Sequence, residues 1–221
     1  MVVGQLRSMS GDVPGWDAWA DRRGLICAKL KGVDRSSLSV YFQALHGATE
    51  AVFRRALLVG LRLNAVSYKS AQDWLHDHDV TPGLTDYPKR FDRLYAIKGV
   101  SWNDITRPRE RFRGALDLWN GYSKVIRNHL AHSIRSYSDE WLLCAIQVDQ
   151  ILLMEFDLAL EPIIGGSVAH ALTELVPRLP VGRSKQDLSS LTGIRLSKPR
   201  PRASLVGAQA AVKLLLDMPN T

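Results

Sequence analysis

The amino-acid sequence predicts an all-α fold, a bundle of helices with an extension at each end. Three long stretches place apolar residues at alternating spacings of three and four, which is the pattern of a helix with one buried face. No stretch shows the strict two-residue alternation of a half-buried strand. The 221 residues, 46% of them hydrophobic, are enough to bury a sizeable core.

The first expected elements are a short helix and a long one. Residues 1–35 form an N-terminal extension whose helix, residues 14–23, carries two tryptophans that could pack on the bundle. The first long helix is expected over residues 38–63, with Ser36 or Ser37 as its cap. Its apolar stripe consists of Leu38, Phe42, Leu45, Ala48, Val52, Ala56, Val59 and Leu63.

Two shorter helices and a second long helix are expected next. A polar stretch after the first long helix contains helical patterns near residues 71–76 and 89–97. The apolar stripe of the second long helix covers residues 112–130. Thr106 and Pro108 have the residue types that suit its cap and its first turn.

A third long helix completes the bundle. Ser136 followed by Asp139 is a variant capping box, and apolar residues continue from there to Leu160. Pro162 and the glycine pair that follows it are expected to end the helix. The helical domain is therefore placed at residues 36–176.

The C-terminal extension differs from the bundle in composition. Residues 177–203 are rich in Pro, Gly, Ser and basic side chains, which is typical of a linker or an arm, and we call them the basic arm. Residues 204–221 include an amphipathic helix over residues 204–216. This helix could dock on the bundle or on a partner.

Charge and cysteine content narrow the class of protein. The 29 Lys and Arg exceed the 22 Asp and Glu by seven, which favours an anionic partner through long-range attraction. Cys27 and Cys144 lie far apart in apolar contexts, so neither a disulfide framework nor a zinc site is indicated and a reducing cytoplasm is expected. No signal peptide and no run of roughly 20 apolar residues occurs, so no membrane segment is expected.

A segment with residue types suited to acid–base chemistry closes the second long helix. Its sequence is RNHLAH, residues 127–132. It resembles the motif of the HEPN superfamily, an Arg followed after four to six residues by a His at a helix end. Residues 41–50 with Arg54 resemble the first long helix of that family. The resemblance covers about residues 38–164, and it implies an antiparallel helical bundle.

The resemblance also implies a function. HEPN ribonucleases are metal-independent endoribonucleases whose homodimers hold two motifs across a composite cleft, and many are toxins or defence effectors. The implied partners are RNA, a second copy of the chain, and a cognate antitoxin or regulatory protein. In one branch the antitoxin modifies a tyrosine two residues after the motif His. Ile134 occupies that position here and Tyr137 comes three residues later, which departs from this form of regulation.

The two motif residues suit transesterification of RNA without a metal or a cofactor. His132 can move protons near neutral pH, because an unperturbed imidazole has a pKa of about 6.5. Arg127 offers a planar, permanently charged fork to the phosphate oxygens. The expected products carry a 2′,3′-cyclic phosphate and a 5′-hydroxyl. At about 100° per residue, however, Arg127 and His132 lie about 140° apart on a helix. Either His132 turns back at the helix end, or the site combines groups from two copies.

Further residues are expected to support this site. His46, Glu50 and Arg54 repeat every four residues as a polar stripe on the first long helix. Glu50 would hold Arg127 or orient a histidine, and its alternative is a surface pair with Arg54 worth about 0.3–0.5 kcal/mol. Asn128 would fix the backbone or contact RNA. The expected RNA contacts are His46, Arg54, and Arg183, Lys185, Lys198, Arg200 and Arg202 of the basic arm, although such arms are as often merely solvated.

The motif at residues 127–132 also allows less specific interpretations. Basic residues near a helix C-terminus favour the helix dipole, so an Arg and a His at this spacing also occur by chance. A metal site at His129 and His132 is weaker, because no acidic or Cys partner has suitable spacing nearby. The alternative functions are a catalytically silent module that binds RNA or protein, and a dimeric adaptor.

Overall fold

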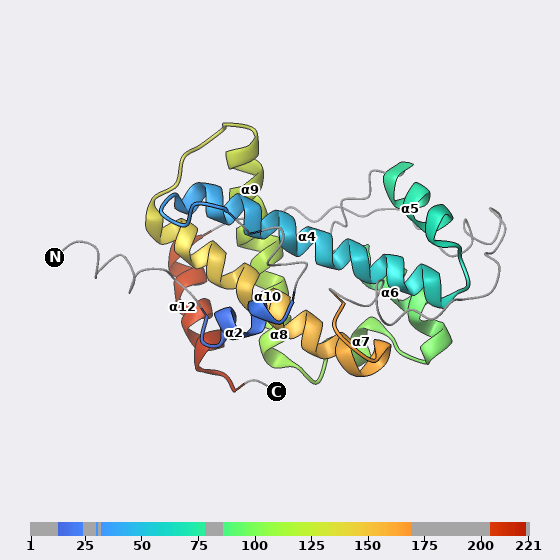
Figure 1. The fold of residues 1–221 in the computed structure, drawn as a ribbon. Helices are drawn as coiled ribbons and strands as arrows, with labels where there is room; N and C mark the ends of the chain where they lie inside the picture. Colours follow the sequence, from blue (N-terminus) through green and yellow to red (C-terminus); the bar gives the residue numbers. More distant parts are fainter. Residues whose placement is uncertain (1–12, 24–29, 31, 78–85, 169–203, 220–221) are drawn as a thin grey trace. The chain divides into compact units, whose positions relative to one another are not determined.

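Every element of secondary structure that the structure describes is a helix. The computed structural model describes residues 13–23, 30, 32–77, 86–168 and 204–219, and these ranges contain no strand (Figure 1). The all-α prediction is confirmed for this part of the chain. None of the helices in the same ranges is both long and apolar enough to cross a membrane. The basic arm lies outside the described residues.

The chain divides into two compact units, each assembled from separate stretches of sequence. Unit 1 consists of Met1–Thr49, Arg109–Phe156 and Arg200–Thr221, and unit 2 consists of Glu50–Pro108 and Asp157–Pro199. The long helices α4 (Leu38–Leu63) and α10 (Asp139–Ile164) each begin in unit 1 and end in unit 2. The helical domain expected at residues 36–176 stays a prediction.

Unit 1 carries the segment that resembles a catalytic motif. Besides its parts of α4 and α10, its elements are α2 (Trp16–Asp21), α8 (Glu110–Leu118), the π-helical turn η2 (Trp119–Ser123), α9 (Lys124–Ala131) and α12 (Leu205–Asp217). The short helices expected at residues 14–23 and 204–216 are present as α2 and α12. Trp16 of α2 is buried, as expected.

The C-terminal helix α12 packs against α8. Ala208, Val212 and Leu215 form its buried face. The two helices approach closely at Gly114, where an added Cβ would lie 2.7 Å from Cδ2 of Leu215. Of the two placements expected for this helix, the structure has the one on the body of the protein.

Unit 2 is built around tyrosine side chains that bond to the backbone of α4. Its other elements are α5 (Tyr68–Asp77), α6 (Tyr87–Tyr95), the 3-10 turn η1 (Ala96–Lys98) and α7 (Trp102–Thr106). The Tyr87 hydroxyl donates to the Phe53 carbonyl at 2.9 Å, and the Tyr95 hydroxyl donates to the Ala56 carbonyl at 2.8 Å. The short helices expected near residues 71–76 and 89–97 correspond to α5 and α6.

The start of the second long helix differs from the prediction. Thr106 does not cap it, because Thr106 is the last residue of α7, a helix that no apolar pattern in the sequence predicts. A capping box begins α7: the Ser101 side chain accepts from the Asp104 N–H while the Asp104 carboxylate accepts from the Ser101 N–H. The long helix instead begins at Glu110.

The second long helix also contains an irregular turn. The apolar stripe predicts a continuous α-helix over residues 112–130, but η2 is a π turn between α8 and α9. A π turn holds more residues than an α turn. Tyr122 and its neighbour Ser123 are consequently both buried.

The third long helix, α10, begins later than expected and ends at the first glycine of the pair expected to end it. The Ser138 carbonyl accepts from the Leu142 N–H at 3.2 Å, so the helix starts after Ser138 and not at Ser136. Pro162 lies inside the last turn of the helix. Gly165 has a left-handed φ of +77° just past the end, so this glycine and not the proline terminates it.

α10 is buried along ten consecutive residues, 148–157, although four of these are polar. Each polar side chain meets a partner from another segment, as buried polar groups require. One of them, Asp149, belongs to a network with His46 and Ser123. The other contacts are Val13 N–H to Gln150 Oε1 (3.0 Å), Arg111 Nη1 to Glu155 Oε1 (3.5 Å), and the Ser167 hydroxyl and Val168 N–H to Asp157 Oδ1 (2.9 and 3.0 Å).

Candidate functional site

The backbone at the end of α9 is fixed by a Schellman-type cap. His132 follows the last helical residue as C-cap, with φ −100° and ψ 10°. Ser133 has a left-handed φ of +52°, and its N–H donates to the Leu130 carbonyl at 3.1 Å. The Ile134 N–H donates to the His129 carbonyl at 2.9 Å. These two bonds define the Schellman motif, so the helix stops directly behind His132.

The motif side chains are accessible to different degrees. His132 and Asn128 are exposed, and Arg127 is partly exposed. Arg127 Nη1 donates to Asn128 Oδ1 at 3.3 Å, while the Asn128 carbonyl accepts from the His132 N–H at 3.1 Å. Asn128 thus contacts the arginine through its side chain and the histidine through its backbone.

Arg127 and His132 do not lie on one face of α9. The chain leaves the helical path at Ser133, after His132, so both residues keep nearly helical positions. Their angular separation around the helix axis therefore stays near the ideal value of about 140°. The cap does not fold His132 back toward Arg127. The other alternative, a site made by two copies of the chain, stays a prediction.

Glu50 and Arg54 lie one helical turn apart on α4, and both are partly exposed. They belong to unit 2, whereas the motif belongs to unit 1. The supporting role of Glu50 and the RNA contact of Arg54 stay predictions. The expected RNA contacts of the basic arm fall outside the described residues.

The structure places His46 in the interior of unit 1. Its side chain has 0% exposure and stacks on the ring of Trp119 with the centroids 4.8 Å apart. His46 Nδ1 lies 2.8 Å from Asp149 Oδ2, and the Ser123 hydroxyl donates to Asp149 Oδ1 at 2.5 Å. An RNA contact by His46, expected from its place on the polar stripe, does not fit this position, because the side chain offers no surface to a ligand.

Ser123, His46 and Asp149 have the residue types of a catalytic triad but a different arrangement. In a triad the serine hydroxyl bonds to the ring nitrogen that does not face the carboxylate. Here the hydroxyl donates to the carboxylate itself, and all three residues are 0% exposed. We interpret the cluster as a buried network that fixes the start of α9, since Ser123 directly precedes that helix. The sequence signal for it is the acidic Asp149 within the apolar stretch of α10.

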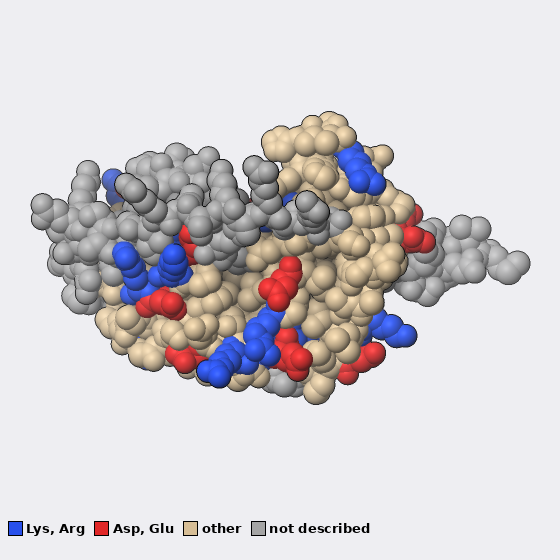
Figure 2. Space-filling view, turned by 180° about the vertical axis from the view of Figure 1, so that it is seen from behind, with Lys and Arg blue, Asp and Glu red and all other residues tan. Residues whose placement is uncertain are grey.

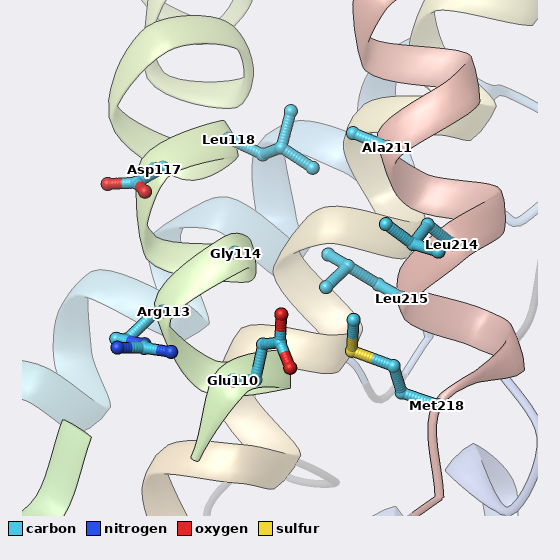
Figure 3. Close-up of a pocket in the computed structure, with 9 residues that line it drawn as sticks. All are labelled: Glu110, Arg113, Gly114, Asp117, Leu118, Ala211, Leu214, Leu215 and Met218. Carbon is cyan, nitrogen blue, oxygen red and sulfur yellow. The ribbon is translucent and has the colours of Figure 1, made fainter. Parts of the chain in front are cut away.

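The groove between α8 and α12 is a second candidate site, with a volume of about 420 Å³ (Figure 3). The groove is lined from α8 by Glu110, Arg113 and Asp117, and from α12 and its C-cap by Leu214, Leu215 and Met218. The lining contains carboxylates and a guanidinium but no histidine, serine, threonine, cysteine or lysine. The groove is therefore a weaker candidate for catalysis than the end of α9.

Two further kinds of site find little support among the described residues. Burial raises the pKa of Cys144 to about 11, so this thiol stays protonated at neutral pH and is a poor nucleophile. Within the described ranges, no three His, Cys, Asp or Glu side chains are placed to hold a metal ion together.

On the face drawn in Figure 2, described Lys and Arg side chains lie among Asp and Glu side chains and form no continuous basic surface.

Comparison with known proteins gives no independent assignment. No family model, curated protein or solved structure matches the chain.

Proposed function

We propose that the chain is a metal-independent endoribonuclease of the HEPN type that works as a homodimer and acts as a toxin or defence effector. The observation that carries the proposal is the end of α9. There Arg127 lies in the last turns of the helix, and the exposed His132 is its C-cap. The resemblance of residues 127–132 to the HEPN motif gives this arrangement its proposed chemistry.

The reaction is a transesterification within the RNA chain. His132 accepts the proton of a 2′-hydroxyl, the 2′-oxygen attacks the adjacent phosphorus, and the bond to the 5′-oxygen breaks. The leaving oxygen takes a proton, which yields a 2′,3′-cyclic phosphate and a 5′-hydroxyl. Arg127 stabilises the negative charge that builds up on the phosphoryl oxygens. Because one α9 does not bring the two side chains together, the partner copy supplies part of each site.

The deciding experiment is cleavage of mixed RNA in the presence of EDTA. The wild-type chain is expected to cut RNA, whereas Arg127→Ala and His132→Ala are each expected to lower the rate by about 100- to 10,000-fold. Arg113→Ala is the matched control, because it removes an exposed guanidinium of α8 in the same unit and should retain full activity.

Different outcomes identify different functions. Intact RNA together with tight, salt-sensitive binding would indicate a silent RNA-binding module. Intact RNA without binding by a dimeric chain would indicate an adaptor. A wild-type chain that cuts RNA as a monomer would contradict the composite site, since Arg127 and His132 would then have to act from one copy.

A further inference from the structure

Four rings contact one another in series from the interior of unit 1 to the loop that follows α9, and we call this series the stack although its central pair is tilted by 47°. Tyr122 stacks on Trp141 with the centroids 5.6 Å apart and 15° between the planes, and Trp141 contacts Tyr137 at 5.3 Å. Tyr137 stacks on His129 at 6.0 Å with the planes 7° apart. Arg135 completes the stack, because its Cζ lies 5.2 Å from the Tyr137 centroid and 5.8 Å from that of Trp141.

We propose that Arg135, Tyr137 and Trp141 form a stacking platform for an unpaired base of single-stranded RNA. The proposal rests on the proposed ribonuclease function and names the class of RNA that the site takes. Proteins that bind single strands stack bases on aromatic rings and on guanidinium planes. A duplex keeps its bases stacked inside the helix, so it would not reach such a platform.

The platform is held in place from below. The Tyr122 hydroxyl donates to the Trp141 carbonyl at 2.9 Å, which fixes the start of α10. The Tyr137 hydroxyl and His129 Nδ1 are hydrogen-bonded at 2.5 Å, which ties the loop after α9 back to α9. Tyr122 is buried, whereas Tyr137 and Trp141 are partly exposed. The rings are thus ordered before any ligand arrives, which lowers the entropy cost of binding.

The outer end of the stack faces solvent. Residues 131–136 are all exposed, and Arg135 covers the two rings from that exposed loop. A base could stack on the outer face of the guanidinium or take its place over Tyr137. The positive charge would also attract the phosphate of the same nucleotide.

The platform lies next to the proposed general base in the chain. Arg135 comes three residues after His132, and an extended chain spans at most about 3.5 Å per residue, so the two Cα atoms lie within roughly 11 Å. A base on the platform therefore belongs to a nucleotide near the phosphate that His132 would act on. In this proposal, binding of an unpaired base is thereby linked to the position of the cut.

The stack could also have a purely structural role, in which it only anchors the loop. The two roles differ in what they require of Arg135. Arg135→Lys keeps the positive charge but removes the planar guanidinium, so it tests stacking separately from charge. Arg113→Lys is the matched control, because it makes the same change at an exposed guanidinium of α8 that lies outside the stack.

The experiment measures binding in EDTA by fluorescence anisotropy, with the full chain carrying His132→Ala so that the RNA stays intact. The probes are a labelled oligouridylate of 12 nucleotides, the same strand with abasic internal positions, and a blunt duplex of equal length. The intact strand is expected to bind most tightly. Loss of the bases, Arg135→Lys and Tyr137→Leu should each weaken its binding by about 5- to 100-fold. Arg113→Lys should leave the affinity unchanged.

Equal affinity for the intact and abasic strands, or an unchanged affinity in Arg135→Lys, would overturn the platform. Cleavage by the wild-type chain, measured in parallel, keeps this failure separate from failure of the proposed function. If RNA is cut but Arg135→Lys binds normally, the ribonuclease stands and the platform falls. If RNA is not cut but binding depends on bases and on Arg135, the platform stands and the ribonuclease falls. Absence of any binding would overturn the platform as well.

Discussion

Two histidines of unit 1, His46 and His132, show how differently one residue type can be used. His46 has no exposed surface and lies in a network with Asp149, Ser123 and the Trp119 ring. His132 is exposed at the end of α9, and the backbone around it is fixed by a Schellman cap. Both are candidate site residues by sequence. The surroundings of His46 indicate a role in the folded structure, whereas the exposed His132 is accessible to a substrate.

A cluster of reactive residue types is therefore not itself evidence of a reaction. The three polar residues of the buried cluster are 0% exposed and present no surface to a substrate. The end of α9 is exposed, and exposure is what a site that must meet a ligand requires. Substitutions in the two regions test this contrast, from the largest expected change in stability to the smallest.

Replacing Asp149 should have the largest effect on stability. Asp149→Ala removes the carboxylate that bonds to both Ser123 and His46, and it leaves these two buried groups with only their 3.3 Å contact to each other. We expect the free energy of unfolding, measured by urea denaturation, to fall by about 3–5 kcal/mol. Asp149→Asn, which keeps the shape and one acceptor, should lose less. A loss below about 0.5 kcal/mol for the alanine variant would contradict a structural role for the network.

Loss of the Ser123 hydroxyl should lower the free energy of unfolding less than loss of the Asp149 carboxylate does. It should lower it more than loss of an exposed hydroxyl does. Ser123→Ala removes one buried donor to Asp149, and we expect it to lower the free energy of unfolding by about 1–3 kcal/mol. Ser136 is exposed in the loop after α9. Ser136→Ala is therefore the matched control and should stay within about 0.5 kcal/mol of the wild type. Equal effects of the two substitutions would remove the distinction between the buried and the exposed region.

The long helices are predictable from sequence because their apolar stripes are consistent over many residues. α4 begins and ends at the residues expected, Leu38 and Leu63. α7 has five residues, which is too short for a periodic pattern, and only its capping box could indicate it. The π turn depends on the burial of Ser123 against residues that lie 77 and 26 positions away in the chain. No local pattern contains that information.

The candidate site is predictable in its residue types but not in its surroundings. The motif at residues 127–132 and its place at a helix end follow from the sequence. The Schellman cap does not, because it uses Ser133 where such caps usually have glycine. The burial of His46 does not either, because its partner Asp149 is 103 positions away. A polar stripe alone cannot distinguish an exposed histidine from one that a distant carboxylate binds in the core.

The cap at the end of α9 should store a small amount of strain. Ser133 has a left-handed φ of +52°. This conformation is unfavourable for a residue with a Cβ atom, whereas glycine adopts it without strain. Ser133→Gly is expected to raise the free energy of unfolding by about 0.5–1 kcal/mol, measured by urea denaturation. Ala65 has the same role after α4, with φ +61° and the same pair of cap bonds, so Ala65→Gly should give a similar gain. Destabilisation by both glycines would show that the cap conformation is not strained.

His132→Ala should have the smallest effect on stability, although it has the largest expected effect on cleavage. The side chain is exposed, so its removal creates no cavity and leaves no buried group unsatisfied. We expect the free energy of unfolding to change by less than about 0.5 kcal/mol, whereas His46→Ala, which removes a buried ring stacked on Trp119, should cost several times more. Urea denaturation of both variants compares the two histidines directly. A large loss of stability in His132→Ala would mean that loss of cleavage in this variant reports unfolding, and the contrast between the two regions would no longer hold.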